Sequence, residues 1–157
     1  MMHVHILAVG RLRDSPERRL VDDFLAQFNR ITQGLGMGPA TVTEIIERKN
    51  GGRVAETRLL QASVPKRAVV CLLDERGATM TSPSFAEWLE RLRDEGTPHL
   101  AFMIGGADGV DPDFRARADQ VMSFGAMVWP HKLVRVMLAE QLYRAVTILA
   151  GTPYHRS

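Results

Sequence analysis

Two runs of apolar residues constrain the fold of this chain more than any other feature. Residues 68–73 read Ala-Val-Val-Cys-Leu-Leu, and residues 100–104 read Leu-Ala-Phe-Met-Ile. Runs without a polar side chain are typical of strands whose two faces are both covered, as they are inside a parallel sheet. The sequence therefore indicates an α/β fold with helices on both faces of a central sheet.

Strand and helix patterns alternate along the rest of the chain. We expect further strands at 3–9, 41–46 and 121–124. We expect helices over 15–31, 53–63, 82–95, from 111 onward and over 132–150. The alternation is typical of βαβ units and predicts a doubly wound, parallel-type sheet.

Prolines and glycines mark the expected boundaries of these elements. Ser15, Ser82 and Asp111 each precede a proline, which predicts three helices that begin with a capping side chain and proline at the first helical position. The glycines and proline over 34–39 are expected to break the chain before the strand at 41–46.

Length and composition exclude several classes of protein. With 157 residues, 45% of them hydrophobic, the chain is expected to form one domain over residues 1–157. The single Cys71 excludes a disulfide framework and a cysteine-rich zinc site, and His3 and His5 lack a third ligand at metal spacing. No apolar run approaches a membrane span and the N-terminus does not resemble a signal peptide, so we expect a cytoplasmic protein.

The charges are unevenly distributed. Residues 48–67 hold six basic and one acidic residue, residues 74–119 five basic and ten acidic, and residues 121–157 four basic and one acidic. The segments thus carry +5, −5 and +3. If the two basic segments meet, they form a cationic patch suited to a nucleic acid, and otherwise they are solvated surface.

The loops after the expected strands are the places where a ligand would bind in a parallel sheet. Gly105-Gly106 and Gly109 follow the strand at 100–104, and they predict either a close backbone approach to a ligand or a plain turn. Residues 124–130 are almost wholly apolar although they follow a strand, so they are expected to be core or to enclose an apolar ligand. No dinucleotide-binding fingerprint or Walker A lysine pattern is present.

The last expected helix has a cation near its N-terminus and apolar residues on both of its sides. Arg135 lies in its first turn, where the helix dipole disfavours a cation, and in line with an apolar stripe. This placement suggests a held anion or carboxylate; the alternatives are an arginine that reaches solvent or pairs with an acid of another helix. Apolar residues also occupy the opposite side, so we expect a homodimer that buries Leu133, Met137 or Tyr143.

The chain ends with Tyr154, His155 and Arg156. These side chains can stack on a base, move a proton and hold a phosphate, whereas an ordinary terminus would be disordered.

Six segments resemble one family. They are His5–Gly10, Leu73–Gly77, Phe102–Gly109, Pro130–Val136, Glu140–Ala145 and Tyr154–Arg156. Together they resemble the bacterial 23S rRNA pseudouridine N3-methyltransferases of the SPOUT class (the RlmH family). The resemblance covers the whole chain, and its specific part runs from Pro130 to the end.

The resemblance implies a fold, a cofactor and a substrate. The fold would be an α/β domain with a C-terminal trefoil knot, assembled as a homodimer. S-adenosylmethionine would bind in the knot, and no metal would be needed. The implied cofactor residues are Leu73, Asp74, Gly105, Gly106, Phe124, Gly125, Ala126, Met127, Val128 and Trp129. The implied substrate is pseudouridine 1915 in helix 69 of 23S rRNA, within the assembled ribosome. Relatives carry Ser or Thr in the 124–129 loop, and this chain does not.

The implied reaction assigns roles to the polar residues near the C-terminus. Pseudouridine N3 must lose its imide proton before it can attack a methyl sulfonium. His155 is the expected base, with Tyr154 or a water as relay and His131 as a second candidate. Arg135 and Arg156 would stabilise the anion or hold phosphates. Two other functions remain open: a non-catalytic ribosome- or RNA-binding protein and a flavodoxin-like domain for a small ligand.

Overall fold

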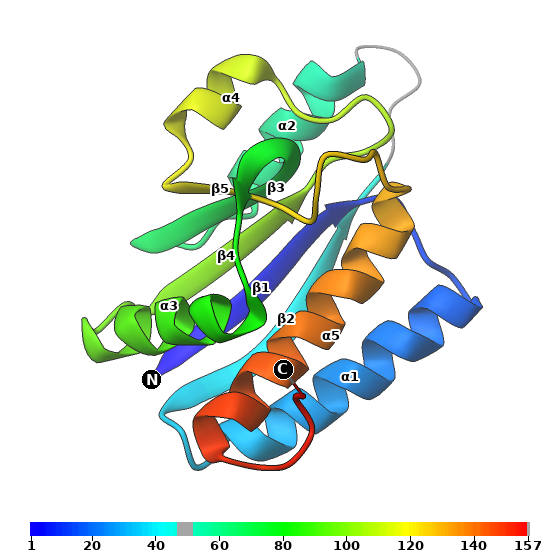
Figure 1. Ribbon diagram of the computed structural model, residues 1–157. Coiled ribbons are helices and arrows are strands. Elements are labelled where there is room, and N and C mark those ends of the chain that lie inside the picture. Colours follow the sequence, from blue (N-terminus) through cyan, green and yellow to red (C-terminus); the bar gives the residue numbers. More distant parts are fainter. Residues whose placement is uncertain (47–51, 157) are drawn as a thin grey trace.

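The computed structural model describes residues 1–46 and 52–156 and contains five strands and five helices in that part of the chain (Figure 1). The strands are β1 (Met2–Val9), β2 (Met37–Ile45), β3 (Ala68–Thr79), β4 (His99–Ile104) and β5 (Gln120–Ser123). The helices are α1 (Pro16–Thr32), α2 (Gly52–Ala62), α3 (Ser82–Asp94), α4 (Pro112–Arg117) and α5 (His131–Ala150). Arg48 and Lys49 of the basic segment lie outside the described residues.

The strands form one parallel sheet in the order β2-β1-β4-β3-β5. The two apolar runs are β4 and the first half of β3, and they pair in register from Ala68 opposite His99 to Leu73 opposite Ile104. Both lie inside the sheet, where each strand has two neighbours. The prediction of a parallel α/β sheet is confirmed, because side chains without polar groups are stable only where both faces are covered.

Helices cover both faces, and each face has its own hydrophobic core (Figure 1). On one face, side chains such as Ile6 and Phe102 pack against α1, α3 and α5. On the other, neighbours such as Leu7 and Met103 pack with Leu60 of α2 and with residues of α4. Because side chains alternate along a strand, β1 and β4 contribute to both cores.

Two of the three predicted caps are confirmed, and one is wrong by a residue. The Ser15 hydroxyl accepts from the Arg18 N–H, and the Asp111 carboxylate accepts from the Asp113 N–H. For α3 the cap is Thr81, whose Oγ1 accepts from the Ser84 N–H at 3.1 Å, and Ser82 is already helical. A proline is tolerated at the second helical position as well as the first, since neither N–H has a partner within the helix.

The predicted break over 34–39 is shorter than expected. β2 begins at Met37, so Gly38 and Pro39 lie inside the strand. β2 is an edge strand, where a residue without an N–H is tolerated. Gly38 lies against the ring of His3, and a Cβ there would be 2.5 Å from its Nδ1.

β3 extends to Thr79, beyond the predicted end at residue 73. Its register against β5 jumps, because both Leu73 and Ala78 lie opposite Met122. Residues 74–77 therefore bulge out, and Gly77 lies so close to the backbone of Val121 that a Cβ would be 2.6 Å away. This bulge forms one wall of the cleft described below. The topology is consistent with the C-terminal knot, which stays a prediction.

Helix α5 lies between α1 and α3 on one face of the sheet (Figure 1). The Tyr143 ring lies 4.6 Å from the Tyr154 ring and 6.1 Å from Phe24, between centroids. Phe24 and Tyr154 of the same chain thus cover part of the apolar side of α5 that we expected a dimer partner to cover. Leu133 stays 40% exposed. Within residues 1–46 and 52–156, no helix is long and apolar enough to cross a membrane.

Three histidines meet near the amino ends of β1 and β4. His5 Nε2 and His99 Nδ1 are 3.0 Å apart, and the His3 ring centroid is 5.7 Å from that of His99. In the described part of the chain, no group of three ligating side chains is arranged to hold a metal ion. Burial, and then the neighbouring His99 and His3, lower the pKa of His5 below its usual value.

Acidification is therefore expected to destabilise the fold. Because the pKa of His5 is lower in the folded protein, the unfolded chain binds more protons once the pH falls below about 6.5. We expect the melting temperature to fall between pH 7.5 and 5.5, measured by calorimetry. The variant His5→Gln should have a flatter profile. A wild-type profile as flat as that of the variant would contradict this expectation.

Candidate functional site

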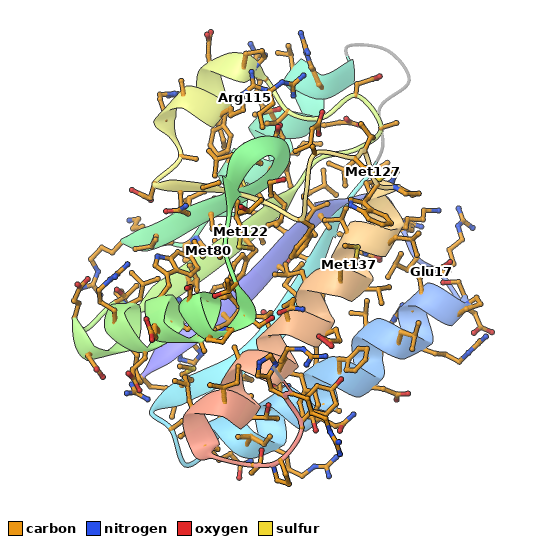
Figure 2. All side chains as sticks on the ribbon, in the orientation of Figure 1. Glu17, Met80, Arg115, Met122, Met127 and Met137 are labelled. Atoms are coloured by element: carbon orange, nitrogen blue, oxygen red, sulfur yellow. The ribbon has the colours of Figure 1, made fainter. Side chains whose placement is uncertain are left out.

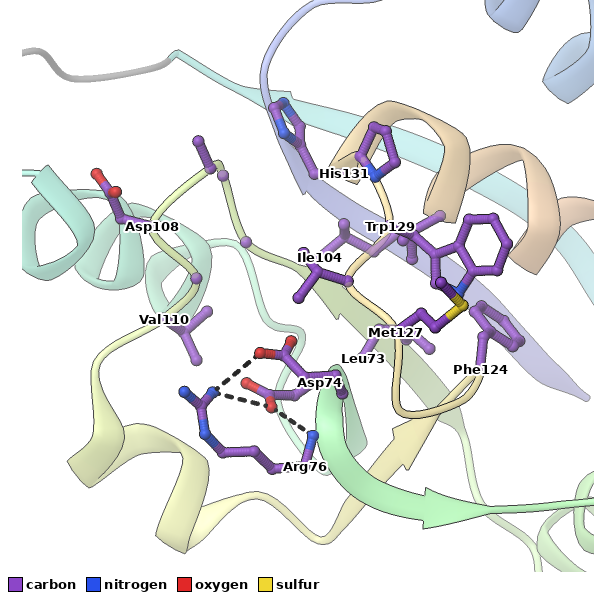
Figure 3. A pocket seen from close by; sticks show the side chains of 18 of the residues that line it. Leu73, Asp74, Arg76, Ile104, Asp108, Val110, Phe124, Met127, Trp129 and His131 are labelled. Atoms are coloured by element: carbon purple, nitrogen blue, oxygen red, sulfur yellow. Dashed lines mark hydrogen bonds and ion pairs between the residues drawn. The ribbon is translucent and has the colours of Figure 1, made fainter.

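A cleft of about 660 Å³ opens at the carboxyl edge of the sheet (Figure 3). The bulge within β3, the loops after β4 and β5 and the first turn of α5 line it. This is the place where a parallel sheet binds its ligands, and the volume suits a nucleotide-sized molecule.

Nine of the ten predicted cofactor residues line this cleft. They are Leu73, Asp74, Gly105, Gly106, Phe124, Gly125, Met127, Val128 and Trp129. The tenth, Ala126, is exposed and does not line it. The three loops, which are separate in sequence, thus converge on one cavity.

The loop after β4 is tight and requires its glycines. The Gly109 N–H donates to the Gly106 carbonyl at 3.0 Å, which closes the loop. A Cβ on Gly105 would be 2.8 Å from the backbone of Gly109, and one on Gly106 would be 3.1 Å from Val9. Only residues without a side chain fit here, so the backbone itself forms this wall.

The loop after β5 is apolar and open to the cleft. Met127 is 75% exposed, Val128 78% and Trp129 43%. Figure 2 shows Met127 near the start of α5, and Figure 3 shows Met127 and Trp129 on the opposite side of the cavity from Arg76. Phe124 packs against the core, whereas the alternative that the segment 124–130 is core is wrong for residues 126–130, which are exposed. An apolar ligand or a partner chain would cover them.

Asp74 is the nearly buried acid of the cleft, with a side chain 6% exposed. Its Oδ1 accepts from the Arg76 N–H at 2.9 Å, and its carboxylate pairs with the guanidinium groups of Arg76 at 3.3 Å and Arg115 at 3.6 Å (Figure 3). Arg115 comes from α4 (Figure 2). These contacts fix the bulge after β3 and balance the charge of the acid.

Arg135 does not reach the cleft, which corrects its predicted contact with the substrate. The residue is fully buried, and its Nη1 lies 2.7 Å from Glu44 Oε2. Its Nη2 donates to the Gly10 carbonyl at 2.9 Å. Arg135 therefore pairs with an acid elsewhere in its own chain, as one of the alternatives expected, although that acid lies on β2 and not on another helix. The guanidinium is thus directed at Glu44 and at the end of β1, and Arg135 is not among the residues that line the cleft.

The environment keeps this ion pair charged. Partial burial would raise the pKa of Glu44, but the Leu12 N–H at 2.9 Å and the Arg135 guanidinium outweigh it, so the pKa lies below its usual value. Burial lowers the pKa of Arg135, and Glu44 opposes that effect. The pair links the ends of β1 and β2 to the first turn of α5.

The other predicted catalytic residues fall into two places. His131, the first residue of α5, lines the cleft. Tyr154 and His155 fold back on α5, where Tyr154 Oη donates to Glu140 and His155 contacts Arg144. Arg144 follows His131 by 13 residues, or about 20 Å along a helix axis. The cleft of a protomer therefore does not include its own tail, and Arg156 is exposed.

Three residues that hold predicted site residues in place were not anticipated from the sequence. Glu44 holds Arg135, and Glu140 and Arg144 hold the tail. Glu140 and Arg144 are spaced i, i+4 on one helix, which is a recognisable signal of an ion pair. No local pattern connects Glu44 to Arg135, 91 residues away.

The chain is similar over nearly its whole length to proteins of one group. Residues 2–155 match the family described as "Predicted SPOUT methyltransferase". A protein of Dinoroseobacter shibae named "Ribosomal RNA large subunit methyltransferase H" is 61% identical over 155 residues, 99% of each chain. Proteins of the same name from Ruegeria pomeroyi and Paracoccus denitrificans are 60% and 52% identical, again over 99% of each chain.

The buried ion pair leads to a prediction about stability. Glu44→Leu strands a fully buried guanidinium and should lower the free energy of unfolding by about 3–5 kcal/mol, measured with urea. Arg135→Met should be milder, because the Glu44 side chain is 27% exposed and can be hydrated.

The double variant and an exposed pair provide the controls. The double variant Glu44→Leu with Arg135→Met should lose clearly less than the sum of the single changes, since neither charge is stranded. Arg19→Ala breaks the exposed pair with Asp14 and should cost at most about 1 kcal/mol. Additive single effects would show that the two side chains do not stabilise each other.

Proposed function

The chain belongs to the SPOUT methyltransferase family, and from this premise we propose that it methylates the RNA of the large ribosomal subunit with S-adenosylmethionine as methyl donor. The main support for this proposal is that the three predicted cofactor loops line one cleft. The names of its relatives, identical at up to 61% of positions, support rRNA as the substrate.

The cleft suits S-adenosylmethionine by size and by lining. The glycine wall at 105–109 permits close backbone approach, and Phe124, Met127 and Trp129 offer apolar cover for an adenine ring. Asp74 offers a carboxylate for hydroxyl or ammonium groups. When bound, S-adenosylmethionine supplies an electrophilic methyl carbon on a sulfonium.

For the target we propose N3 of pseudouridine 1915 in helix 69, within the assembled ribosome. The exposed Arg53 and Arg58 of α2 support an RNA surface near the cleft. In a parallel sheet, the helix after a strand begins at the carboxyl edge, and so Arg53 lies at the end of the molecule where the cleft opens (Figure 1). Guanidinium groups at that edge can pair with phosphates of a stem-loop.

The tail supports a site shared between two protomers. Tyr154 and His155 are about 20 Å along α5 from the cleft of their own chain, so they can act on its methyl donor only from another copy. The exposed Leu133, Val128 and Trp129 beside the cleft offer an apolar surface for that copy. We therefore propose a homodimer in which the tail of one protomer completes the cleft of its partner.

Each proposed tail residue has a defined chemical capacity. Tyr154 donates to Glu140, and burial together with that carboxylate raises the pKa of Tyr154, so it stays protonated near neutral pH. Tyr154 therefore serves as a hydrogen-bond donor, here to Glu140. Arg156 is exposed and can hold a phosphate. His131 lies in the cleft, where it can contact the substrate ring.

Cofactor binding gives the first test. Saturating S-adenosylmethionine, at 100 times its dissociation constant, should stabilise the wild type by about 2.7 kcal/mol in thermal unfolding. Gly105→Ala should lose that gain, because its Cβ would collide with the Gly109 backbone. Gly34→Ala is the matched control, since a Cβ there meets nothing within 4 Å. A wild type that shows no shift would refute the methyltransferase proposal and favour a non-catalytic RNA-binding protein.

A mixing experiment tests the shared site. Gly105→Ala should inactivate the cleft and His155→Ala the tail, so each variant alone should methylate ribosomes poorly. Equal mixing after exchange of protomers should restore about a quarter of the wild-type activity, because half the dimers are mixed and each has one intact site. Mass spectrometry of the rRNA measures the product and its position. If the mixture is no more active than the single variants, cleft and tail act within one protomer.

A further inference from the structure

The C-terminal tail is held on α5 by a network centred on Glu140. Glu140 Oε2 lies 2.8 Å from Arg144 Nη2 and accepts from Tyr154 Oη at 3.2 Å, while Oε1 accepts from Arg144 Nε at 3.0 Å. The guanidinium also lies over the Tyr154 ring, 4.9 Å from its centroid. A two-point ion pair of this kind fixes the orientation of Arg144.

Arg144 in turn determines which nitrogen of His155 carries the proton. Arg144 Nη1 lies 3.1 Å from His155 Nδ1. A guanidinium has five donors and no acceptor, so Nδ1 must supply the lone pair. A neutral imidazole with an acceptor at Nδ1 carries its hydrogen at Nε2.

This arrangement leaves His155 no free lone pair with which to take a proton. Nδ1 is occupied by Arg144, and Nε2 already carries hydrogen. Nε2 is buried, and no hydrogen-bond partner for it is present among the described residues. A buried donor without an acceptor is unfavourable, so a movement of the tail that brings Nε2 to a substrate oxygen would satisfy this donor.

We propose that His155 acts on the substrate as a hydrogen-bond donor through Nε2, and that Glu140 and Arg144 are the positioning residues that set this tautomer. The inference rests on the proposed function and replaces the expected role of His155 as the base. In the described part of the chain, Arg144 and Glu140 hydrogen-bond the side chains of His155 and Tyr154, and Tyr143 packs on the Tyr154 ring. Glu140, the acid in this group, already accepts from Arg144 and Tyr154.

The donor role fits the charge that develops in the reaction. When N3 of the base loses its proton to water, the negative charge spreads onto the two carbonyl oxygens beside N3. The N3 lone pair then forms the new N–C bond as the S–C bond of the methyl donor breaks, and S-adenosylhomocysteine leaves. A fixed N–H directed at one of those oxygens stabilises the anion before and during transfer.

Three substitutions at His155 separate a donor from a base. Glutamine places an N–H near the position of Nε2, asparagine places it near Nδ1, and alanine supplies none; none of the three can take a proton near neutral pH. If His155 donates, His155→Gln should keep methylation of ribosomes within about tenfold of the wild type, and His155→Ala and His155→Asn should lose about 10²–10³-fold in kcat. Equal losses in all three variants would overturn the proposal.

The positioning role has a readout that does not depend on activity. Nitrogen-15 NMR of the His155 ring should show hydrogen at Nε2 in the wild type, and a mixture of tautomers in Arg144→Ala and in Glu140→Gln. Glu140→Asp should partly restore the wild-type signal, whereas Arg18→Ala, which breaks another i, i+4 pair with Asp22, should leave it unchanged. Hydrogen at Nδ1 in the wild type would also overturn the proposal.

Different results would refute the proposed substrate and the proposed donor role of His155. A wild type that binds S-adenosylmethionine but methylates no ribosomal RNA would refute the proposed substrate, and the NMR result would still report on the tautomer. A wild type that is active, with His155→Gln as impaired as His155→Ala, would leave the methyltransferase intact and refute only the donor role.

Discussion

The buried pair of Arg135 and Glu44 joins the parts of the molecule on which the cleft depends. Arg135 is fully enclosed, and its guanidinium binds Glu44 on β2 and the Gly10 carbonyl at the end of β1. The same residue lies in the first turn of α5, directly after the apolar loop that lines the cleft. A buried charge requires its partner, so these three segments are fixed relative to one another. The cation that the helix dipole disfavours is thus stabilised by a carboxylate.

Helix α5 carries two functional regions that cannot meet within one chain. Its start lines the cleft with His131, and its later turns hold Tyr154 and His155 through Glu140 and Arg144. A helix is rigid over this distance, so the separation is a fixed property of the protomer. The proposed homodimer follows from this geometry more directly than from apolar pattern alone, because α1 and α3 already cover much of α5. Among the exposed apolar residues, Met127, Val128 and Trp129 line the cleft, and Leu133 follows them in the first turn of α5.

The sequence predicted the elements well where the physical cause is local. Apolar runs located β3 and β4, and the proline-linked caps located the starts of α1 and α4. The errors are also local in kind: Thr81 takes the place of Ser82 as a cap, and Pro39 lies inside an edge strand. The place of Pro39 could not be decided without knowing strand order, because an edge position makes a proline acceptable inside a strand. The bulge after Leu73 depends in the same way on the pairing of β3 with β5.

By itself, then, the sequence determined the α/β class, the parallel sheet and the strand-end loops that line the cleft, because strand ends and glycine loops are encoded by neighbouring residues. The nine predicted cofactor residues in those loops came from the resemblance to a family. The tertiary structure decided what the charged side chains do. It turned Arg135 from an expected ligand of the substrate into the partner of Glu44, and it placed the lone pair of His155 against Arg144. The physical reason is that an ion pair or a hydrogen bond depends on distance in space, and residues 44 and 135 become neighbours only when β2 and α5 pack on the same sheet.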